Sequence, residues 1–220
     1  KICDGNIMKN LWLKNKIWRL GMGWFGGRRW YQYIEFSSKI NTKNSVKERG
    51  IIRTNNFLKF IDNYEFLSED RILDIGSNAG LFCLKVSEKV TDVIGVELDS
   101  AFHKQAIFVK KYFTNENKKY DNVKLMNLDL TNNLEIIDDR TLIFASKVLY
   151  HKNLGDKLYD LMERIQKSQV HTIIMQGHTT QGEIGQNKGM KNLMKEYGFF
   201  FETVIEHYEY PVAIAKRIKS

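Results

Sequence analysis

The chain has 220 residues, of which 43% are apolar and 27% are charged, as in an ordinary globular domain. This composition excludes a disordered or fibrous protein, and no apolar run is long enough to predict a membrane span. The formal net charge of +8 favours anionic partners such as nucleic acid, phosphorylated glycans or an anionic membrane surface. A lysine-rich solvated surface is the simpler explanation of the same charge.

The two cysteines, Cys3 and Cys83, lie far apart in the sequence and form no CxxC motif. They predict neither a disulfide framework nor a zinc site, and they favour a reducing compartment. The N-terminal residues lack the apolar stretch and cleavage site of a secretory signal, so we expect a cytoplasmic protein, with the inner membrane face as an alternative location. No cluster of histidine and acidic residues has metal-ligand spacing, so we expect no bound metal.

Residues 1–53 differ from the rest of the chain and are predicted to form an N-terminal helical cap. Aromatic residues are interleaved with lysines and arginines in this segment: Trp12, Lys14, Lys16, Trp18, Arg19, Trp24, Arg28, Arg29, Trp30, Tyr31 and Tyr33. Such a segment is typical of a lid over a substrate pocket, a membrane-interface helix or an RNA-stacking surface. We prefer the lid, then membrane contact, then RNA contact, because so many tryptophans usually have to bury their area.

Residues 54–220 are predicted to form one α/β domain. Thr54 is a candidate N-cap for a helix through Ile61, and Phe57 and Leu58 would lie on its apolar face. From about Asp70, short apolar strands alternate with amphipathic helices, which is typical of a parallel sheet covered on both faces. The predicted strands are Arg71 to Ile75, Asp92 to Glu97, Val123 to Leu128, Thr141 to Ala145, His171 to Met175, Phe199 to Glu206 and Pro211 to Ile218. The predicted helices between them are Leu81 to Val90, Ser100 to Phe113, Leu154 to Gln166 and Lys188 to Tyr197.

The last two predicted strands, Phe199 to Glu206 and Pro211 to Ile218, are separated by only a few residues. That connection is too short for a parallel crossover. The sheet is therefore predicted to close with an antiparallel hairpin.

The first predicted strand runs into Asp74-Ile75-Gly76-Ser77-Asn78-Ala79-Gly80. Gly76 and Gly80 allow a tight turn and a close approach to a ligand, and the helix that follows directs free N–H groups toward a carboxylate. A dinucleotide site would require glycine at Asn78 and a small residue at Leu81. Asp74 would repel a pyrophosphate, yet it complements an ammonium or sulfonium group. S-adenosylmethionine (SAM) combines a carboxylate, an ammonium and a sulfonium.

Two more acids follow strand ends. Glu97 stands about 20 residues after the first glycine, where wound nucleotide sites place an acid that accepts from the ribose hydroxyls. Asp129 follows the third predicted strand, where it can accept from an adenine amino group while Leu128 or Leu130 covers the ring. Because consecutive strand ends meet at one edge, we expect these sites to share a crevice.

These segments, LDIGSNAG, GVELD and NLDL, resemble the first three motifs of class I SAM-dependent methyltransferases, and the closing hairpin matches their sheet. The resemblance implies a three-layer α/β/α fold with seven strands in the order 3-2-1-4-5-7-6, the last strand antiparallel. It implies SAM as cofactor and S-adenosylhomocysteine as product. The predicted cofactor-binding residues are Asp74, Gly76, Ser77, Asn78, Gly80, Glu97, Leu98, Asp129, Leu130 and Tyr150.

The fourth strand leads into Lys147-Val148-Leu149-Tyr150-His151, at the edge where this fold places acceptor contacts. His151 is our first candidate for a general base toward a hydroxyl, and His178, after the fifth strand, is the rival. His151 could equally cap the following helix. Tyr150 would line the sulfonium pocket, and Lys147 could orient an anionic acceptor.

The segments KVLYH and WYQYIEF resemble parts of the methyltransferase-like enzymes that modify wobble uridines in transfer RNA. We predict O-methylation of a hydroxyl on a small molecule or glycan. One alternative is a wobble-uridine-type transfer RNA methyltransferase. The other is a noncatalytic protein of the same fold whose basic terminus serves as an RNA or membrane adaptor.

Overall fold

Seven strands form one mixed sheet in the order β5-β4-β3-β6-β7-β9-β8. The fold comes from a computed structural model, which describes residues 3–21, 29–115, 120–146, 148–149, 156–177, 188–205 and 210–218. The strands are β3 (Arg71–Ile75), β4 (Asp92–Glu97), β5 (Val123–Asn127), β6 (Leu142–Ser146), β7 (Thr172–Gln176), β8 (Phe199–Ile205) and β9 (Val212–Arg217). Because a hairpin precedes the sheet, β3 is the first predicted strand, and the observed order confirms 3-2-1-4-5-7-6.

The strand directions also confirm the prediction. Leu73 in β3 pairs in parallel with Ile94 of β4 and with Ile143 of β6. β9 runs antiparallel to β7 on one side and to β8 on the other. The short β8–β9 connection leaves no room for the crossover that a parallel pair requires.

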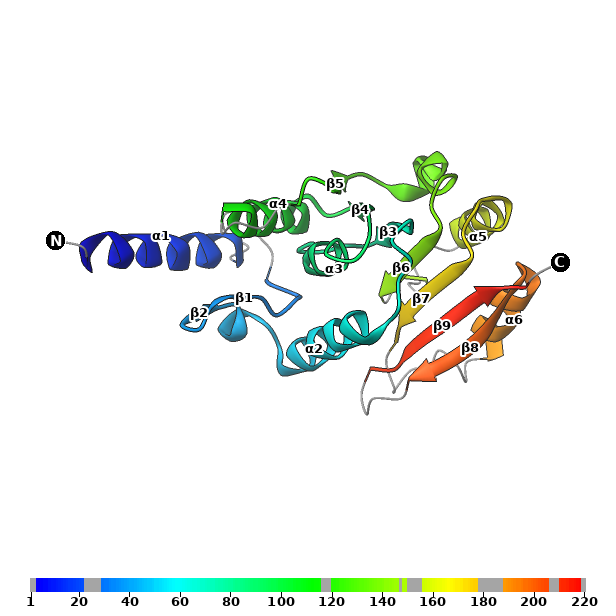
Figure 1. Ribbon diagram of the computed structural model, residues 1–220, viewed down its shortest axis with the longest axis horizontal. Helices are drawn as coiled ribbons and strands as arrows, with labels where there is room; N and C mark the ends of the chain where they lie inside the picture. Colours follow the sequence, from blue (N-terminus) through cyan, green and yellow to red (C-terminus); the bar gives the residue numbers. More distant parts are fainter. Residues whose placement is uncertain are drawn as a thin grey trace.

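Helices cover both faces of this sheet (Figure 1). They are α1 (Cys3–Gly21), α2 (Glu48–Asn63), α3 (Leu81–Val86), α4 (Ser100–Asn115), α5 (Lys157–Lys167) and α6 (Lys188–Glu196). The first four share one apolar core with the sheet, which includes Phe57 and Phe144. Helices α5 and α6 share the second core on the other face, around Leu161 and Met194. This is the predicted three-layer arrangement.

The predicted start of α2 at Thr54 is wrong. The helix begins at Glu48, after Lys47, so Thr54 lies inside it. The Thr54 hydroxyl donates to the carbonyl of Gly50 at 2.8 Å and accepts from the N–H of Tyr33 at 3.1 Å. Threonine thus satisfies its hydroxyl by bonding back one helical turn, which is an alternative to capping. The division that we predicted between residues 53 and 54 falls within this helix.

Helix α3 is shorter than predicted, because it ends at Val86 rather than Val90. The Ser87 hydroxyl donates to the carbonyl of Leu84, and the side-chain amide of Asn122 donates to the carbonyls of Ser87 and Val90. The Leu84 carbonyl thus accepts from a side chain where a longer helix would have used the N–H of Glu88, and Asn122 satisfies two carbonyls beyond the helix end. The spacing of apolar residues in the sequence gives no sign of these side-chain hydrogen bonds, so the helix end was predicted too late.

The N-terminal segment contains α1 and a short hairpin, β1 (Glu35–Ser37) with β2 (Ile40–Asn41). Trp30 is 2% exposed, and its indole N–H donates to the carbonyl of Ile17 at 3.0 Å. Trp12 and Trp18, in contrast, are 60% and 54% exposed. The predicted burial of tryptophans therefore holds for Trp30 but not for the two on α1. None of the described helices is long and apolar enough to cross a membrane.

Candidate functional site

A cavity of about 320 Å³ opens at the carboxyl ends of β3 and β4, beside the segments that follow β5 and β6. Parallel α/β sheets bind ligands at this edge because the loops after the strands converge there. The lining residues are Ile75, Gly76, Val96, Glu97, Leu98, Leu128, Asp129, Leu130, Thr131, Val148, Lys157 and Leu161. Five separate stretches of sequence thus meet in one place.

The loop after β3 turns through three left-handed residues. Gly76, Asn78 and Gly80 have φ angles of 72°, 54° and 73°. The N–H groups of Gly76 and Ser77 both donate to the carbonyl of Val96, at 2.9 and 3.0 Å, which fastens the loop to β4. A Cβ atom on Gly76 would lie 2.7 Å from Cγ2 of Val148. Glycine at this position therefore provides both the backbone angle and the space beside the cavity.

Glu97 is the last residue of β4 and is almost fully buried, although it borders the cavity. Its Oε2 accepts from the N–H of Asn78 at 2.9 Å, and its Oε1 accepts from the N–H of Asp99 at 2.8 Å. Burial raises the pKa of Glu97 above its ordinary value, and these two N–H donors oppose that rise. Each carboxylate oxygen can still accept a second hydrogen bond.

Asp129 lies across the cavity at the start of a short 3₁₀ helix, η3 (Leu130–Asn132). Its Oδ1 accepts from the N–H and the hydroxyl of Thr131, at 3.0 and 2.6 Å. Lys157 Nζ lies 3.6 Å from Oδ2 and donates to the Thr131 hydroxyl. The bond from the Thr131 hydroxyl is the main cause that lowers the pKa of Asp129, and Lys157 adds to it. Asp129 is thus a charged acceptor at neutral pH.

Apolar side chains form the remaining walls of the cavity. Leu98 is 69% exposed, an unusual position for a leucine, and it borders the cavity beside the carboxylate of Glu97. Leu128, Leu130 and Val148 complete these walls. The cavity therefore offers apolar surface for a ring and carboxylates for hydroxyl and amino groups.

Asp74 faces away from this cavity. It is 1% exposed and accepts from the thiol of Cys83, on α3, at 3.2 Å. Burial raises its pKa to about 7, and the charge of Glu97 adds to that rise. Burial also raises the pKa of the Cys83 thiol well above its usual value. Asp74 is therefore a partly protonated residue behind the loop and not a fixed negative charge in the cavity.

The ten predicted cofactor residues divide into three groups. Five of them line the cavity: Gly76, Glu97, Leu98, Asp129 and Leu130. Four others lie behind it or elsewhere in the loop: Asp74, Ser77, Asn78 and Gly80. Tyr150 lies outside the described residues, as do Lys147 and both candidate bases, His151 and His178.

Sequence reasoning missed two polar lining residues, Thr131 and Lys157. Lys157 begins α5, and its place near Asp129 depends on how that helix packs against η3. Thr131 could have been predicted from the sequence, because an acid two residues before a threonine is a common turn and capping pattern. Within the described part of the chain, no group of three or more histidine, cysteine or acidic residues could hold a metal ion.

Several solved structures with a similar fold are methyltransferases. Magnesium protoporphyrin IX methyltransferase from Synechocystis PCC 6803, with bound SAM, has a TM-score of 0.56 and 11% identity, covering 74% of this chain and 77% of that one. Ribosomal protein L11 methylase from Lactobacillus delbrueckii subsp. bulgaricus has a TM-score of 0.58 and 12% identity, covering 86% and 100%. A TehB-like SAM-dependent methyltransferase from Corynebacterium glutamicum has a TM-score of 0.54 and 17% identity, covering 73% and 86%.

At these identities the similarity establishes the Rossmann-like methyltransferase fold and not the acceptor. A search of curated protein sequences found no match. The family described as lysine methyltransferase matches residues 33–195, which include every described residue of the cavity. The chain therefore belongs to the lysine methyltransferase family.

Proposed function

We propose that this protein binds SAM in the cavity beside Glu97 and Asp129 and transfers its methyl group to an acceptor. The observation that carries the proposal is the position of these two carboxylates, on adjacent strand ends and around one partly apolar cavity. Glu97 would accept from the ribose hydroxyls, and Asp129 from the adenine amino group. Leu98 and Leu130 would cover the faces of the adenine ring.

The charges around the cavity favour a nucleoside without phosphates. Its described lining residues include two acids, and its one cation, Lys157, is already paired with Asp129. A pyrophosphate beside Glu97 would meet a negative charge, and the described lining residues offer no cation besides the paired Lys157. The same surface suits the ribose and adenine of SAM, which present hydrogen-bond donors to carboxylates.

The methionine part would lie toward Gly76, where the absent side chain leaves space beside Val148. In this proposal Asp74, Ser77 and Gly80 act by shaping the loop rather than by lining the cavity. Asp74 holds α3 through the Cys83 thiol, and Ser77 bonds to β4 through Val96. Asn78 connects the loop to the carboxylate of Glu97.

Bound SAM supplies an electrophilic methyl group: the acceptor lone pair bonds to the methyl carbon while the carbon–sulfur bond breaks, leaving a thioether. The protein's part is to hold the acceptor in line and to exclude water. Tyr150 is predicted to face the sulfonium, whose charge an aromatic ring attracts.

The family favours the side-chain amine of a lysine as the acceptor. A neutral amine already carries a lone pair, so positioning and proton loss are the main requirements for its attack. The hydroxyl of a small molecule or glycan remains the second candidate, favoured by the predicted bases His151 and His178. Transfer RNA remains a third, on the resemblance of KVLYH and WYQYIEF.

Transfer of tritium from methyl-labelled SAM tests the proposal. The protein is incubated with heat-treated cell extract, and the protein, RNA and glycan fractions are counted separately. We expect label in the protein fraction and methyl-lysine after acid hydrolysis, with much less label when the Glu97→Ala variant is used at SAM concentrations near the wild-type Kd. Label in the glycan or RNA fraction instead would identify that class of molecule, and not lysine, as the acceptor. A protein that binds SAM but labels no fraction would favour the noncatalytic adaptor.

A further inference from the structure

Helix α1 carries apolar side chains on two sides. Leu13 and Ile17 are buried in the core, and the carbonyl of Leu20 accepts from the side-chain amide of Gln105 on α4 at 3.0 Å. Met8 and Leu11 lie on the other side and are 68% and 57% exposed. One face of α1 therefore docks on the protein, while a second apolar face lies in solvent together with Trp12 and Trp18.

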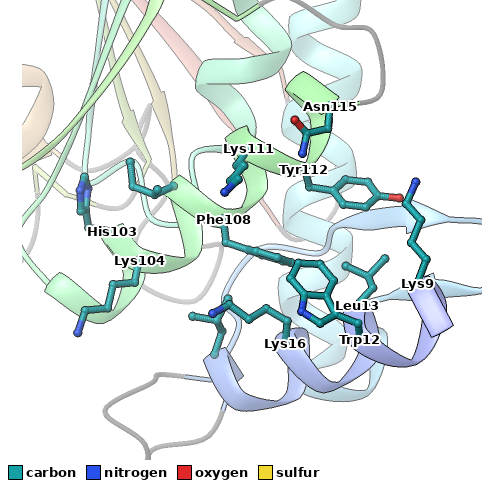
Figure 2. A pocket seen from close by; sticks show the side chains of 12 residues that line it. Lys9, Trp12, Leu13, Lys16, His103, Lys104, Phe108, Lys111, Tyr112 and Asn115 are labelled. Carbon is teal, nitrogen blue, oxygen red and sulfur yellow. The ribbon is translucent and has the colours of Figure 1, made fainter.

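A groove of about 500 Å³ runs between α1 and α4, beside this exposed face. Figure 2 shows Trp12 and Phe108 in its middle, with Lys9 at one end and Lys104 at the other. The two ring centroids are 6.3 Å apart. Ile107 borders the groove from α4 and is itself an exposed apolar residue. The groove extends the apolar surface of α1 onto the body of the protein.

The charge of this surface has one sign. Lysines from both helices line the groove, namely Lys9, Lys16, Lys104 and Lys111, and none of the described lining residues is acidic. The sequence has no acidic residue from Gly5 to Ile34, although six lysines and arginines fall in that stretch. The occupant that complements this surface is anionic and also has apolar parts.

We propose that α1 and the adjoining groove bind an anionic lipid bilayer. Exposed tryptophans and aliphatic side chains enter the boundary between headgroups and acyl chains, while lysines beside them reach the anionic headgroups. RNA suits the surface less well, because Met8, Leu11 and Ile107 are aliphatic and offer no flat ring on which a base can stack. The inference does not depend on the methyltransferase activity.

Co-sedimentation with lipid vesicles tests this inference on the full chain. We expect binding to vesicles of mixed phosphatidylcholine and phosphatidylglycerol, and little binding to phosphatidylcholine alone. Binding should weaken as salt is added, because salt screens the lysines from the headgroups. The tryptophan emission should shift to shorter wavelength on the anionic vesicles, since Trp12 and Trp18 leave water. No binding to anionic vesicles at low salt overturns the proposal.

Two matched pairs of variants locate the surface. Met8→Ser with Leu11→Ser should weaken vesicle binding by roughly ten-fold for each side chain, because each loses apolar burial. The control removes two other exposed apolar side chains far from α1 in the sequence, Leu67→Ser with Ile218→Ser, and should stay within about two-fold of wild type. Circular dichroism checks that both variants remain folded.

The second pair changes charge. Three lysines of the groove are replaced by glutamine in one variant: Lys16, Lys104 and Lys111. Three exposed lysines elsewhere are replaced in the control: Lys59, Lys124 and Lys191. The groove variant should lose roughly five-fold in binding per lysine, and the control should lose much less, although both lower the net charge equally. Equal losses would show that overall charge, not this surface, attracts the vesicles.

Two other occupants give distinct results. Binding of a single-stranded RNA oligonucleotide that exceeds vesicle binding, and that the groove variant abolishes, would replace the bilayer with RNA. A dimer in light scattering that Met8→Ser with Leu11→Ser dissociates, without vesicle binding, would show that a second copy covers the surface.

Discussion

The N–H of Asn78 donates to Oε2 of Glu97 at 2.9 Å, so the loop after β3 is fastened to the last side chain of β4. The other oxygen of Glu97 accepts from Asp99, at the entry to α4. Two segments that the sequence presents as separate motifs are therefore one hydrogen-bonded unit. A change at Glu97 acts on the loop as well as on the cavity.

Replacing Glu97 by alanine should lower both cofactor affinity and stability. In the proposed SAM complex two ribose hydroxyls would lose their acceptor, and the N–H groups of Asn78 and Asp99 lose theirs. We expect each loss to be about 1 to 3 kcal/mol. Calorimetry measures the affinity, and urea unfolding measures the stability. Glu135→Ala, a control at an exposed acid, should change neither. Unchanged affinity in Glu97→Ala would remove this residue from the site.

Two glycines have left-handed backbones, and replacing each by alanine distinguishes the cost of backbone strain from the cost of a steric clash. Gly76 and Gly198 have φ angles of 72° and 80°, but a Cβ on Gly198 would meet nothing within 4 Å. Gly198→Ala should therefore cost only the backbone strain, about 1 kcal/mol of unfolding free energy. Gly76→Ala adds the contact with the stiff side chain of Val148 and should cost roughly 1 to 3 kcal/mol more.

Cofactor affinity distinguishes the same two variants. Gly76→Ala should weaken binding because its new methyl group lies beside the cavity, while Gly198→Ala should bind as wild type does. Equal stability losses and equal affinities in the two variants would contradict the close approach of Gly76 to Val148.

Asp74 predicts a specific dependence of stability on pH. Its folded pKa of about 7 lies above its ordinary value of 3.8, so between these values the native protein binds more protons than the unfolded chain. The contribution of Asp74 to stability therefore falls as pH rises through this window. Asp74→Asn stays neutral throughout. We expect the unfolding free energy of Asp74→Asn, measured with urea, to rise relative to that of wild type between pH 4 and about pH 7. The total change should be on the order of a few kcal/mol, and the difference should stay constant at higher pH. If the unfolding free energies of the two proteins change with pH in parallel, the pKa of the Asp74 carboxyl is not raised in the folded protein.

The predicted bases are tested by the pair His151→Gln and His178→Gln. Glutamine keeps hydrogen-bonding capacity but cannot take a proton. If the acceptor is a hydroxyl activated by His151, turnover should fall by about 100-fold in the first variant while cofactor affinity holds. A large effect only in the second variant would move the base to the segment after β7. No effect in either would favour the lysine amine.

The alternation of buried strands and amphipathic helices predicted a parallel sheet covered on both faces, whereas the strand order came from the resemblance to class I methyltransferases. The short interval between Ile205 and Val212 required an antiparallel pair. Glu97 and Asp129 were predictable for a related reason, since each follows a strand whose end must lie at the ligand edge. The closing hairpin and the place of these two acids depend on local pattern and chain connectivity.

Other features depend on packing between distant segments, which no local pattern encodes. Asp74 lies on the face of β3 that turns toward Cys83, so its carboxyl is buried behind the loop. Lys157 reaches Asp129 only because α5 packs against η3, the 3₁₀ helix that follows β5. The true start of α2 was missed because Thr54 is a good capping residue that bonds to Gly50 instead.

The central claim is that the cavity beside Glu97 and Asp129 holds SAM. Isothermal titration calorimetry with S-adenosylhomocysteine and with NAD tests it most directly, because both ligands contain adenosine and only NAD carries a pyrophosphate. We predict micromolar binding of S-adenosylhomocysteine, weakened in Glu97→Ala, and no comparable binding of NAD. Comparable binding of NAD, or no binding of S-adenosylhomocysteine by the folded wild-type protein, would contradict the claim.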